Sequence, residues 1–152
     1  LDVGVALAPP LIKEVRKAIP AGHDVILDAP PGTSCPVIAA IRETDIVLLV
    51  TETTPFGLND LVLAVDMVRA LGLPFGVIVN RMGSGDRRIQ EFCEKENIAI
   101  LLTIPDDRRI AENYSRGILM VDALPEYEAV FKDLLQKIRK MSVKGEKQHA
   151  YV

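Results

Sequence analysis

The sequence has no tryptophan and only two cysteines, Cys35 and Cys93, in 152 residues. Two thiols cannot build a disulfide framework or a four-ligand metal site within one chain, and sparse cysteine is typical of a reducing compartment. No apolar run reaches the roughly 20 residues of a membrane-spanning helix, and the first residues lack the charged-then-apolar pattern of a secretory signal. These absences argue against a secreted or membrane protein and predict a cytoplasmic one.

An excess of positive charge is also missing. The formal net charge is −3, which argues against nucleic-acid binding because no basic face dominates. Hydrophobic residues make up 49% and charged residues 26% of the chain, which excludes disorder. We expect one globular domain over residues 1–141, followed by a flexible polar tail over residues 142–152.

Short apolar runs alternate with amphipathic stretches along the chain. The apolar runs are typical of parallel strands covered on both faces, and the stretches between them carry apolar residues at helical spacing. This order predicts an α/β fold, a three-layer parallel sheet with helices on both faces. The predicted strands are 24–28, 45–50, 75–79 and 98–102, and the predicted helices are 11–19, 37–41, about 60–71, 86–96, 108–115 and 126–141.

The first predicted strand ends in a carboxylate, Asp28, followed by a proline-stiffened turn and Gly32. In nucleotide hydrolases an acid at this place holds Mg²⁺, directly or through water, and the amide of the glycine lies within reach of a terminal phosphate. The alternative is an ordinary strand end whose aspartate caps the next element.

Polar loops also follow the other predicted strands. Residues 51–57 form a threonine-rich loop, Asn80 and Arg81 begin the next loop, and Pro105 with Asp106 follows the last strand. In an open parallel sheet such loops line the ligand crevice. We therefore expect a binding site at this edge of the sheet.

Several short motifs lie at these strand ends in one order: Asp28-Ala-Pro-Pro-Gly32, Ser34-Cys35-Pro36-Val37-Ile38, Val50-Thr51-Glu52-Thr53-Thr54-Pro55-Phe56-Gly57-Leu58, Val79-Asn80-Arg81, Ile104-Pro105-Asp106 and Tyr114-Ser115-Arg116-Gly117. In this order they resemble the MinD/ParA group of deviant Walker-motif P-loop ATPases. The chain is most similar to the carboxyl-terminal half of the MinD-superfamily ATPases that carry an inserted ferredoxin domain. The resemblance covers about residues 8–140.

The resemblance implies ATP or ADP with Mg²⁺ as ligands. Asp28 would help to hold Mg²⁺ near the β- and γ-phosphates, and Gly32 would be the switch glycine. Thr51, Glu52 and Pro55 would shape the crevice near the phosphates or a partner subunit, without a chemical role of their own.

The base pocket is implied in the same way. Asn80 would meet the adenine edge, because its amide offers the donor and the acceptor that a purine edge requires. Arg81 would stack on the base or line its pocket, and Pro105 with Asp106 would form the other wall. Without the resemblance, Asn80 and Arg81 are typical of an ordinary strand-ending turn.

Two motifs of such ATPases are missing from the sequence. It has no G-x-x-x-x-G-K-[ST] loop or lysine-bearing variant to surround the phosphates, and no four-cysteine run of a ferredoxin. We expect both upstream of Leu1, so an iron–sulfur cluster would belong only to a missing upstream domain. In the family, the phosphate-loop strand lies between the strands at 24–28 and 45–50. Without it, we expect these strands to shift, to pair with a missing amino-terminal half or another copy of the chain, or to aggregate.

Two functions stay open at this point. The first is the adenine-nucleotide-binding, switch-bearing half of a MinD/ParA-like ATPase, connected with iron–sulfur or redox metabolism and with little or no ATPase activity alone. The second is a non-catalytic interaction module derived from such an ATPase, with an unknown protein partner. The basic last helix also suits an anionic membrane, but we favour its packing on the sheet.

The two cysteines differ in their predicted roles. Cys35 is either a redox-active or cluster-ligating thiol near a helix start, or a small packed residue, and we favour the packed residue. Cys93 lies within a predicted helix and is expected to be structural.

Overall fold

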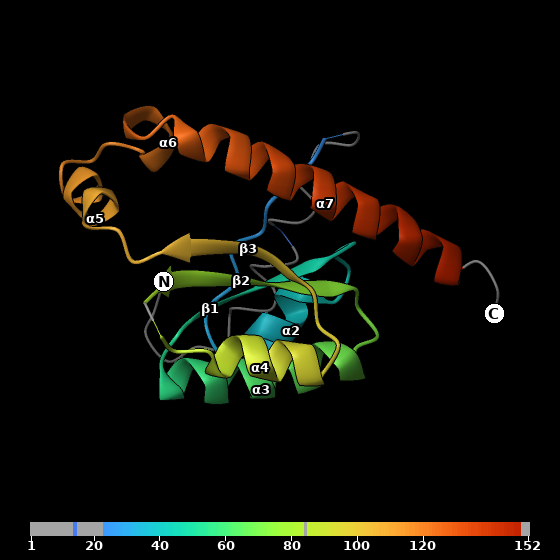
Figure 1. Ribbon diagram of the computed structural model, residues 1–152. Helices are drawn as coiled ribbons and strands as arrows, with labels where there is room; N and C mark the ends of the chain where they lie inside the picture. The colour runs from blue at the N-terminus through green and yellow to red at the C-terminus, as the bar shows by residue number, and fades with distance from the viewer. Residues whose placement is uncertain (1–13, 15–22, 84, 150–152) are drawn as a thin grey trace, which may run out of the picture. The chain divides into compact units, whose positions relative to one another are not determined.

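The computed structural model describes residues 14, 23–83 and 85–149, without the side chains of residues 142–149 (Figure 1). The chain divides into two compact units, residues 1–44 and 45–152, and each is described by itself. The predicted helix 11–19 lies outside the described residues, apart from Glu14.

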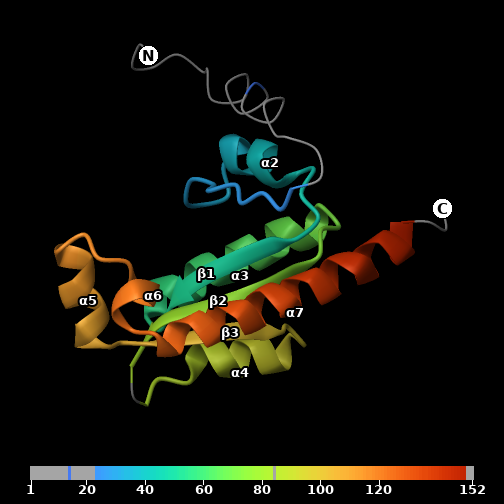
Figure 2. The ribbon, with the colours of Figure 1, turned by 90° about the horizontal axis from the view of Figure 1, so that it is seen from above.

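The second unit is built on a three-stranded parallel sheet in the order β1-β2-β3. The strands are β1 (Val47–Glu52), β2 (Phe75–Met82) and β3 (Ile100–Pro105). Helices cover both faces: α3 (Pro55–Ala70) and α4 (Arg88–Lys95) lie on one face, and α7 (Glu126–His149) lies along the strands on the other (Figure 1, Figure 2). This arrangement confirms the predicted α/β fold with helices on both faces.

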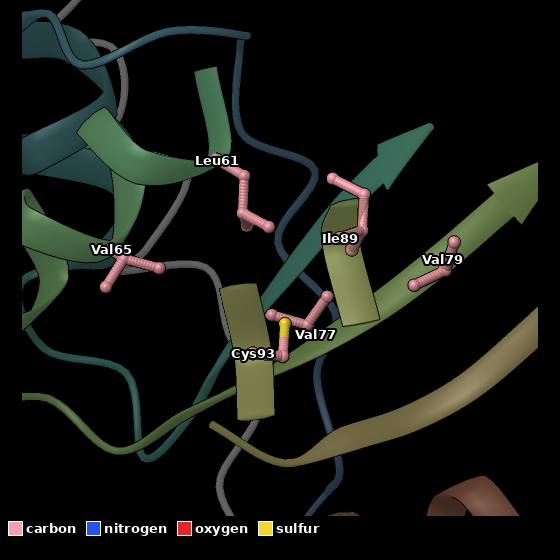
Figure 3. Close-up of a cluster of buried hydrophobic side chains, with 6 residues drawn as sticks. All are labelled: Leu61, Val65, Val77, Val79, Ile89 and Cys93. Atoms are coloured by element: carbon pink, nitrogen blue, oxygen red, sulfur yellow. The ribbon is translucent and has the colours of Figure 1, made fainter. Parts of the chain in front are cut away.

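The central strand explains why its sequence is apolar without alternation. Val77 and Val79 are fully buried against α3 and α4 (Figure 3), while Ile78 between them is buried on the opposite face against Leu134 of α7. Successive strand residues point to opposite faces, so a strand covered on both faces needs apolar side chains at every position. The cluster under α3 and α4 consists of Leu61, Val65, Val77, Val79, Ile89 and Cys93.

Two short helices connect β3 to α7. They are α5 (Arg108–Ser115), whose bounds equal the predicted ones, and α6 (Met120–Ala123), which the sequence did not predict. The last helix, α7, ends at His149 and not at Met141, because no proline interrupts the lysine-rich segment after Met141.

The prediction of a fourth strand at 24–28 is wrong. This segment has no regular secondary structure, and the side chains of Val25 and Ile26 are 42% and 95% exposed. A strand exists only through hydrogen bonds to a neighbouring strand, and among the described residues only β1, β2 and β3 pair. After this segment the first unit contains α2 (Cys35–Ile41), close to the predicted helix.

The start of α3 also differs from the prediction. The sequence predicted a helix from about residue 60, but the helix begins at Pro55 because Thr54 is the N-cap, its hydroxyl accepting a hydrogen bond from Gly57 N (2.9 Å). A threonine followed by proline is a favourable helix start, since proline at the first helical position lacks only an N–H that would have no partner. Of the helices that the structure describes, none is both long and apolar enough to cross a membrane.

Candidate functional site

The loops that follow β1, β2 and β3 lie at one edge of the sheet, which we call the carboxyl edge (Figure 1). It includes the loop 52–54, the end of β2 with the turn that begins there (residues 80–83) and the segment 105–107. Parallel strands bring these loops together although they are far apart in the sequence. The carboxyl edge is therefore the candidate site in the second unit.

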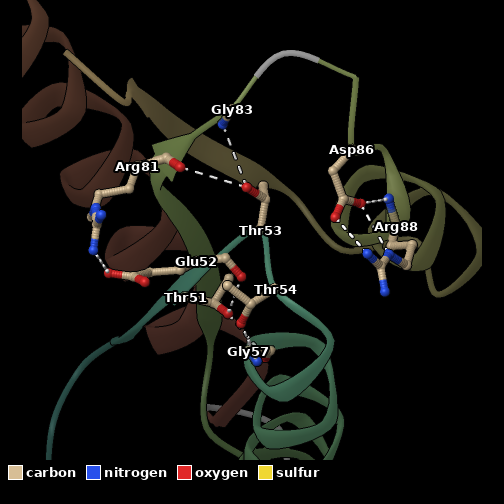
Figure 4. Close-up of polar contacts among 9 residues, drawn as sticks. All are labelled: Thr51, Glu52, Thr53, Thr54, Gly57, Arg81, Gly83, Asp86 and Arg88. Atoms are coloured by element: carbon tan, nitrogen blue, oxygen red, sulfur yellow. Dashed lines mark hydrogen bonds and ion pairs between the residues drawn. The ribbon is translucent and has the colours of Figure 1, made fainter.

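The loop after β1 is held rigidly against the start of α3 (Figure 4). The buried Thr51 donates its hydroxyl hydrogen to Gly57 O (3.0 Å), and Thr54 accepts from Gly57 N (2.9 Å). A Cβ on Gly57 would overlap the Glu52 carbonyl oxygen and lie 3.1 Å from Thr51 Oγ1. The close approach therefore requires glycine at position 57.

The last residues of β2, where the strand leads into a turn, carry Asn80 and Arg81, which were predicted for the base pocket. Asn80 is half-buried, and its Oδ1 accepts a hydrogen bond from Arg81 N (3.0 Å). Arg81 has a left-handed backbone, with φ of 49°. The Thr53 hydroxyl joins this turn to the loop after β1, because Thr53 Oγ1 lies 3.5 Å from Arg81 O and 3.4 Å from Gly83 N (Figure 4).

The Arg81 guanidinium connects all three strand ends. Its Nη1 lies 3.7 Å from Glu52 Oε1 at the end of β1, and its Nε lies 3.6 Å from Asp106 Oδ1 after β3. Asp106 N also donates to Met82 O (3.1 Å), and Met82 pairs with the exposed Pro105. The fold thus brings together the four residues predicted for the base pocket. All three ionic side chains are well exposed, so these ion pairs orient the loops and add little stability.

Glu52 and Thr53 both contact Arg81, which the sequence did not predict. Glu52 was expected only to shape the crevice, and Thr53 was given no individual role. The signal for them was their position, since polar side chains directly after one buried strand can reach the end of the next.

Two carboxylates close to the carboxyl edge form ion pairs with neighbouring arginines. Asp86 accepts from Arg88 Nη2 (2.8 Å), and Asp107, the N-cap of α5, accepts from Arg109 Nη2 (2.7 Å). Hydrogen bonds from these guanidinium groups lower the pKa of Asp86 and of Asp107 below their ordinary values. Each acid also accepts a backbone hydrogen bond at the start of a helix, Asp86 from Arg88 N (3.1 Å) and Asp107 from Arg109 N (2.8 Å).

Asp28 and Gly32 lie in the first unit. Asp28 is exposed in a segment without regular secondary structure, and Gly32 is exposed in the turn that follows. Gly32 has φ of +92°, a left-handed conformation that glycine adopts at no steric cost. The turn thus needs the glycine that the sequence singled out.

The described residues contain no cluster of three or more His, Cys, Asp or Glu side chains that could hold a metal ion. Among these residues Asp28 therefore belongs to no such cluster. Mg²⁺ commonly takes one or two carboxylates and completes its octahedron with water and substrate phosphates, so a cluster of three is not needed to hold it.

The two cysteines differ in exposure. Cys93 is buried in the core, and this burial raises the pKa of its thiol, which confirms the structural role. Cys35 is exposed at the start of α2, so the favoured prediction of a packed residue is wrong. The seven-residue helix α2 packs through Val37, Ala40 and Ile41 and leaves its first residue outside.

No protein-family model matches the chain. It is 37% identical over 92 residues to an uncharacterised protein of Methanocaldococcus jannaschii, covering 60% of this chain and 31% of that protein. It is 27% identical over 119 residues to an iron-sulfur cluster carrier protein of Aquifex aeolicus, covering 68% of this chain and 33% of that protein. The chain thus spans about a third of the length of these curated relatives.

Two solved structures share the fold. The cell division ATPase MinD of Pyrococcus furiosus superposes with a TM-score of 0.68 at 29% identity, covering 87% of this chain and 58% of that one. The MinD cell division protein of Aquifex aeolicus gives a TM-score of 0.65 at 18% identity, covering 86% and 59%. The fold is therefore similar to that of MinD-type P-loop NTPases.

Proposed function

We propose that this chain is the adenine-nucleotide-binding and switch-bearing part of a MinD/ParA-like ATPase. The observation that carries the proposal is the assembly of Asn80, Arg81, Pro105 and Asp106 at one edge of a MinD-like fold. This is the edge at which open parallel sheets bind ligands.

Asn80 is the residue proposed to read the base. Its Oδ1 keeps a second lone pair beside the bond from Arg81 N, and its Nδ2 group is a donor. An asparagine amide can pair with the amino group and the adjacent ring nitrogen of adenine at the same time. Pro105, which pairs with Met82, is exposed and offers an apolar surface for the ring.

Asp28 and Gly32 are proposed to serve the phosphates. The Asp28 carboxylate is a suitable single ligand for Mg²⁺, which would neutralise the phosphate oxygens when bound. The Gly32 amide is an exposed donor in a left-handed turn, a type of backbone that can bind anions, and is proposed to donate to a terminal phosphate.

We also propose that the protein is connected with iron–sulfur metabolism. It rests on the similarity to a protein named as an iron-sulfur cluster carrier. Since the chain spans about a third of that protein's length, the cluster itself would be held by another part of a longer protein or by a partner chain.

The test is nucleotide binding by the complete 152-residue chain. ATP and ADP with Mg²⁺ are titrated to millimolar concentration, followed by calorimetry and by amide chemical shifts. We expect weak binding that Asn80→Ala weakens about tenfold or more, because the variant loses a paired donor and acceptor.

Asn59→Ala is the matched control, since Asn59 is an exposed asparagine on α3. It should bind nucleotide as the unaltered chain does. If no nucleotide binds at millimolar concentration, or if both variants bind alike, the proposal fails and a non-catalytic interaction module becomes the better description.

A further inference from the structure

β2 carries one extra residue opposite β3. Val79 is paired with Thr103 and Met82 with Pro105, so Asn80 and Arg81 together face the single residue Ile104. Against β1 the register of β2 is regular through the pair Glu52 and Asn80. β2 and β3 have two register shifts: the one between Val77 and Ile78 places its extra residue, Leu101, on β3, and the one between Val79 and Met82 is a β-bulge on β2. Bulges beside binding sites redirect side chains.

Arg81 adopts a backbone conformation that its side chain disfavours. Among the described residues other than glycine, only Arg81 and Asn97 have positive φ, 49° and 54°. Asn97 follows the end of α4, where a left-handed residue closes the helix and asparagine is well tolerated. Arg81 ends no helix, and a Cβ in this region is sterically unfavourable. An observed outlier of this kind is a reason to look for a function.

The bulge fixes the orientation of Asn80. Arg81 N donates to Asn80 Oδ1 (3.0 Å), which ties the side-chain amide to the backbone of the next residue. The Thr53 hydroxyl holds the same turn from the side of β1 through Arg81 O and Gly83 N (Figure 4). The amide of Asn80 is therefore preorganised before any ligand arrives.

We propose that Arg81 is a positioning residue, whose left-handed backbone maintains the bulge that aims the Asn80 amide at the base. This inference rests on the proposed function, because it assigns how the base-reading residue is held. It differs from the role that the resemblance implied, in which Arg81 stacks on the base or lines its pocket, since the guanidinium is directed to Glu52 and Asp106.

Two substitutions of Arg81 separate its backbone from its side chain. Arg81→Gly and Arg81→Val both remove the guanidinium and its ion pairs. Glycine adopts positive φ without steric cost, whereas β-branched valine resists it. We expect Arg81→Val to bind adenine nucleotide about tenfold more weakly than Arg81→Gly and to melt about 4 °C or more below it.

The same pair of substitutions at Lys132 is the control. Lys132 is exposed in the interior of α7, where glycine is less favourable than valine. Lys132→Gly should melt no higher than Lys132→Val. A double substitution provides the second control: in an Asn80→Ala background, the affinity difference between Arg81→Gly and Arg81→Val should disappear, because Arg81 acts through Asn80.

Equal affinity of the two Arg81 variants would overturn the inference, as would a difference that persists in the Asn80→Ala background. Either result would leave binding by the unaltered chain dependent on Asn80, so the proposed function would stand. If the unaltered chain binds no adenine nucleotide, the proposed function fails, and the role of the bulge fails with it.

Discussion

At the scale of single residues, the two cysteines have opposite surroundings. Cys93 is 1% exposed, and desolvation raises the pKa of its thiol, so the reactive thiolate is suppressed at neutral pH. Cys35 is exposed. Reactivity is controlled by access and by the thiolate fraction, so the two thiols should differ strongly in rate.

We predict that a disulfide reagent such as Ellman's modifies one thiol per native chain rapidly and the second only after denaturation. Cys35→Ser should abolish the fast reaction, and Cys93→Ser should leave it in place. Because the raised pKa favours the protonated thiol in the fold, the contribution of Cys93 to stability is present at neutral pH and is lost as pH rises above the pKa of an unfolded thiol. Fast modification of the Cys35→Ser variant in its native state would contradict the burial of Cys93.

At the scale of elements, the junction of β1 and α3 depends on one glycine. Alanine normally stabilises a helix relative to glycine, by about 1 kcal/mol. At position 57 the added methyl group would overlap the Glu52 carbonyl oxygen, which belongs to the backbone and cannot rotate away. The steric term therefore outweighs the helix propensity.

We predict that Gly57→Ala lowers the free energy of unfolding by about 1–3 kcal/mol, the usual cost of overpacking. Gly83→Ala is the control, because nothing lies within 4 Å of the Cβ it would add and Gly83 has no positive φ. Its effect should stay within about 0.5 kcal/mol. Urea unfolding followed by circular dichroism measures both, and a stabilised Gly57→Ala variant would refute the close contact.

At the scale of the whole molecule, the chain contains the proposed base site but no lysine-bearing phosphate loop. Phosphoryl transfer depends on groups that surround the γ-phosphate and neutralise its charge. Asp28 and Gly32 supply one carboxylate and one amide, which cannot replace a loop that surrounds the phosphates.

We predict that the purified chain hydrolyses ATP no faster than buffer with Mg²⁺. Phosphate release measured over hours at millimolar ATP tests this. Hydrolysis that Asp28→Ala abolishes would contradict the prediction, since Asp28 alone would then be sufficient to support the reaction. Hydrolysis unaffected by Asp28→Ala would indicate a contaminating enzyme.

Much of the fold followed from the sequence because its signals are local. The run Val77-Ile78-Val79 is apolar at every position, which only a strand covered on both faces requires, and α5 has the bounds that its pattern predicted. Asn80, Arg81, Pro105 and Asp106 were singled out by the resemblance to MinD/ParA ATPases, and they share one edge because residues at the ends of parallel strands must do so. The sequence thus determined the elements and the edge at which the proposed base-pocket residues meet.

Other features depended on contacts between distant segments. The apolar run 24–28 resembles the other strands, but a strand forms only with a hydrogen-bonding neighbour, and none of the described strands pairs with it. The left-handed Arg81, the bulge opposite Ile104 and the Thr53 bridge arise from the relative register of three strands. Register is a tertiary property, because it is set by which side chains pack together across the sheet, and only the folded chain decides it.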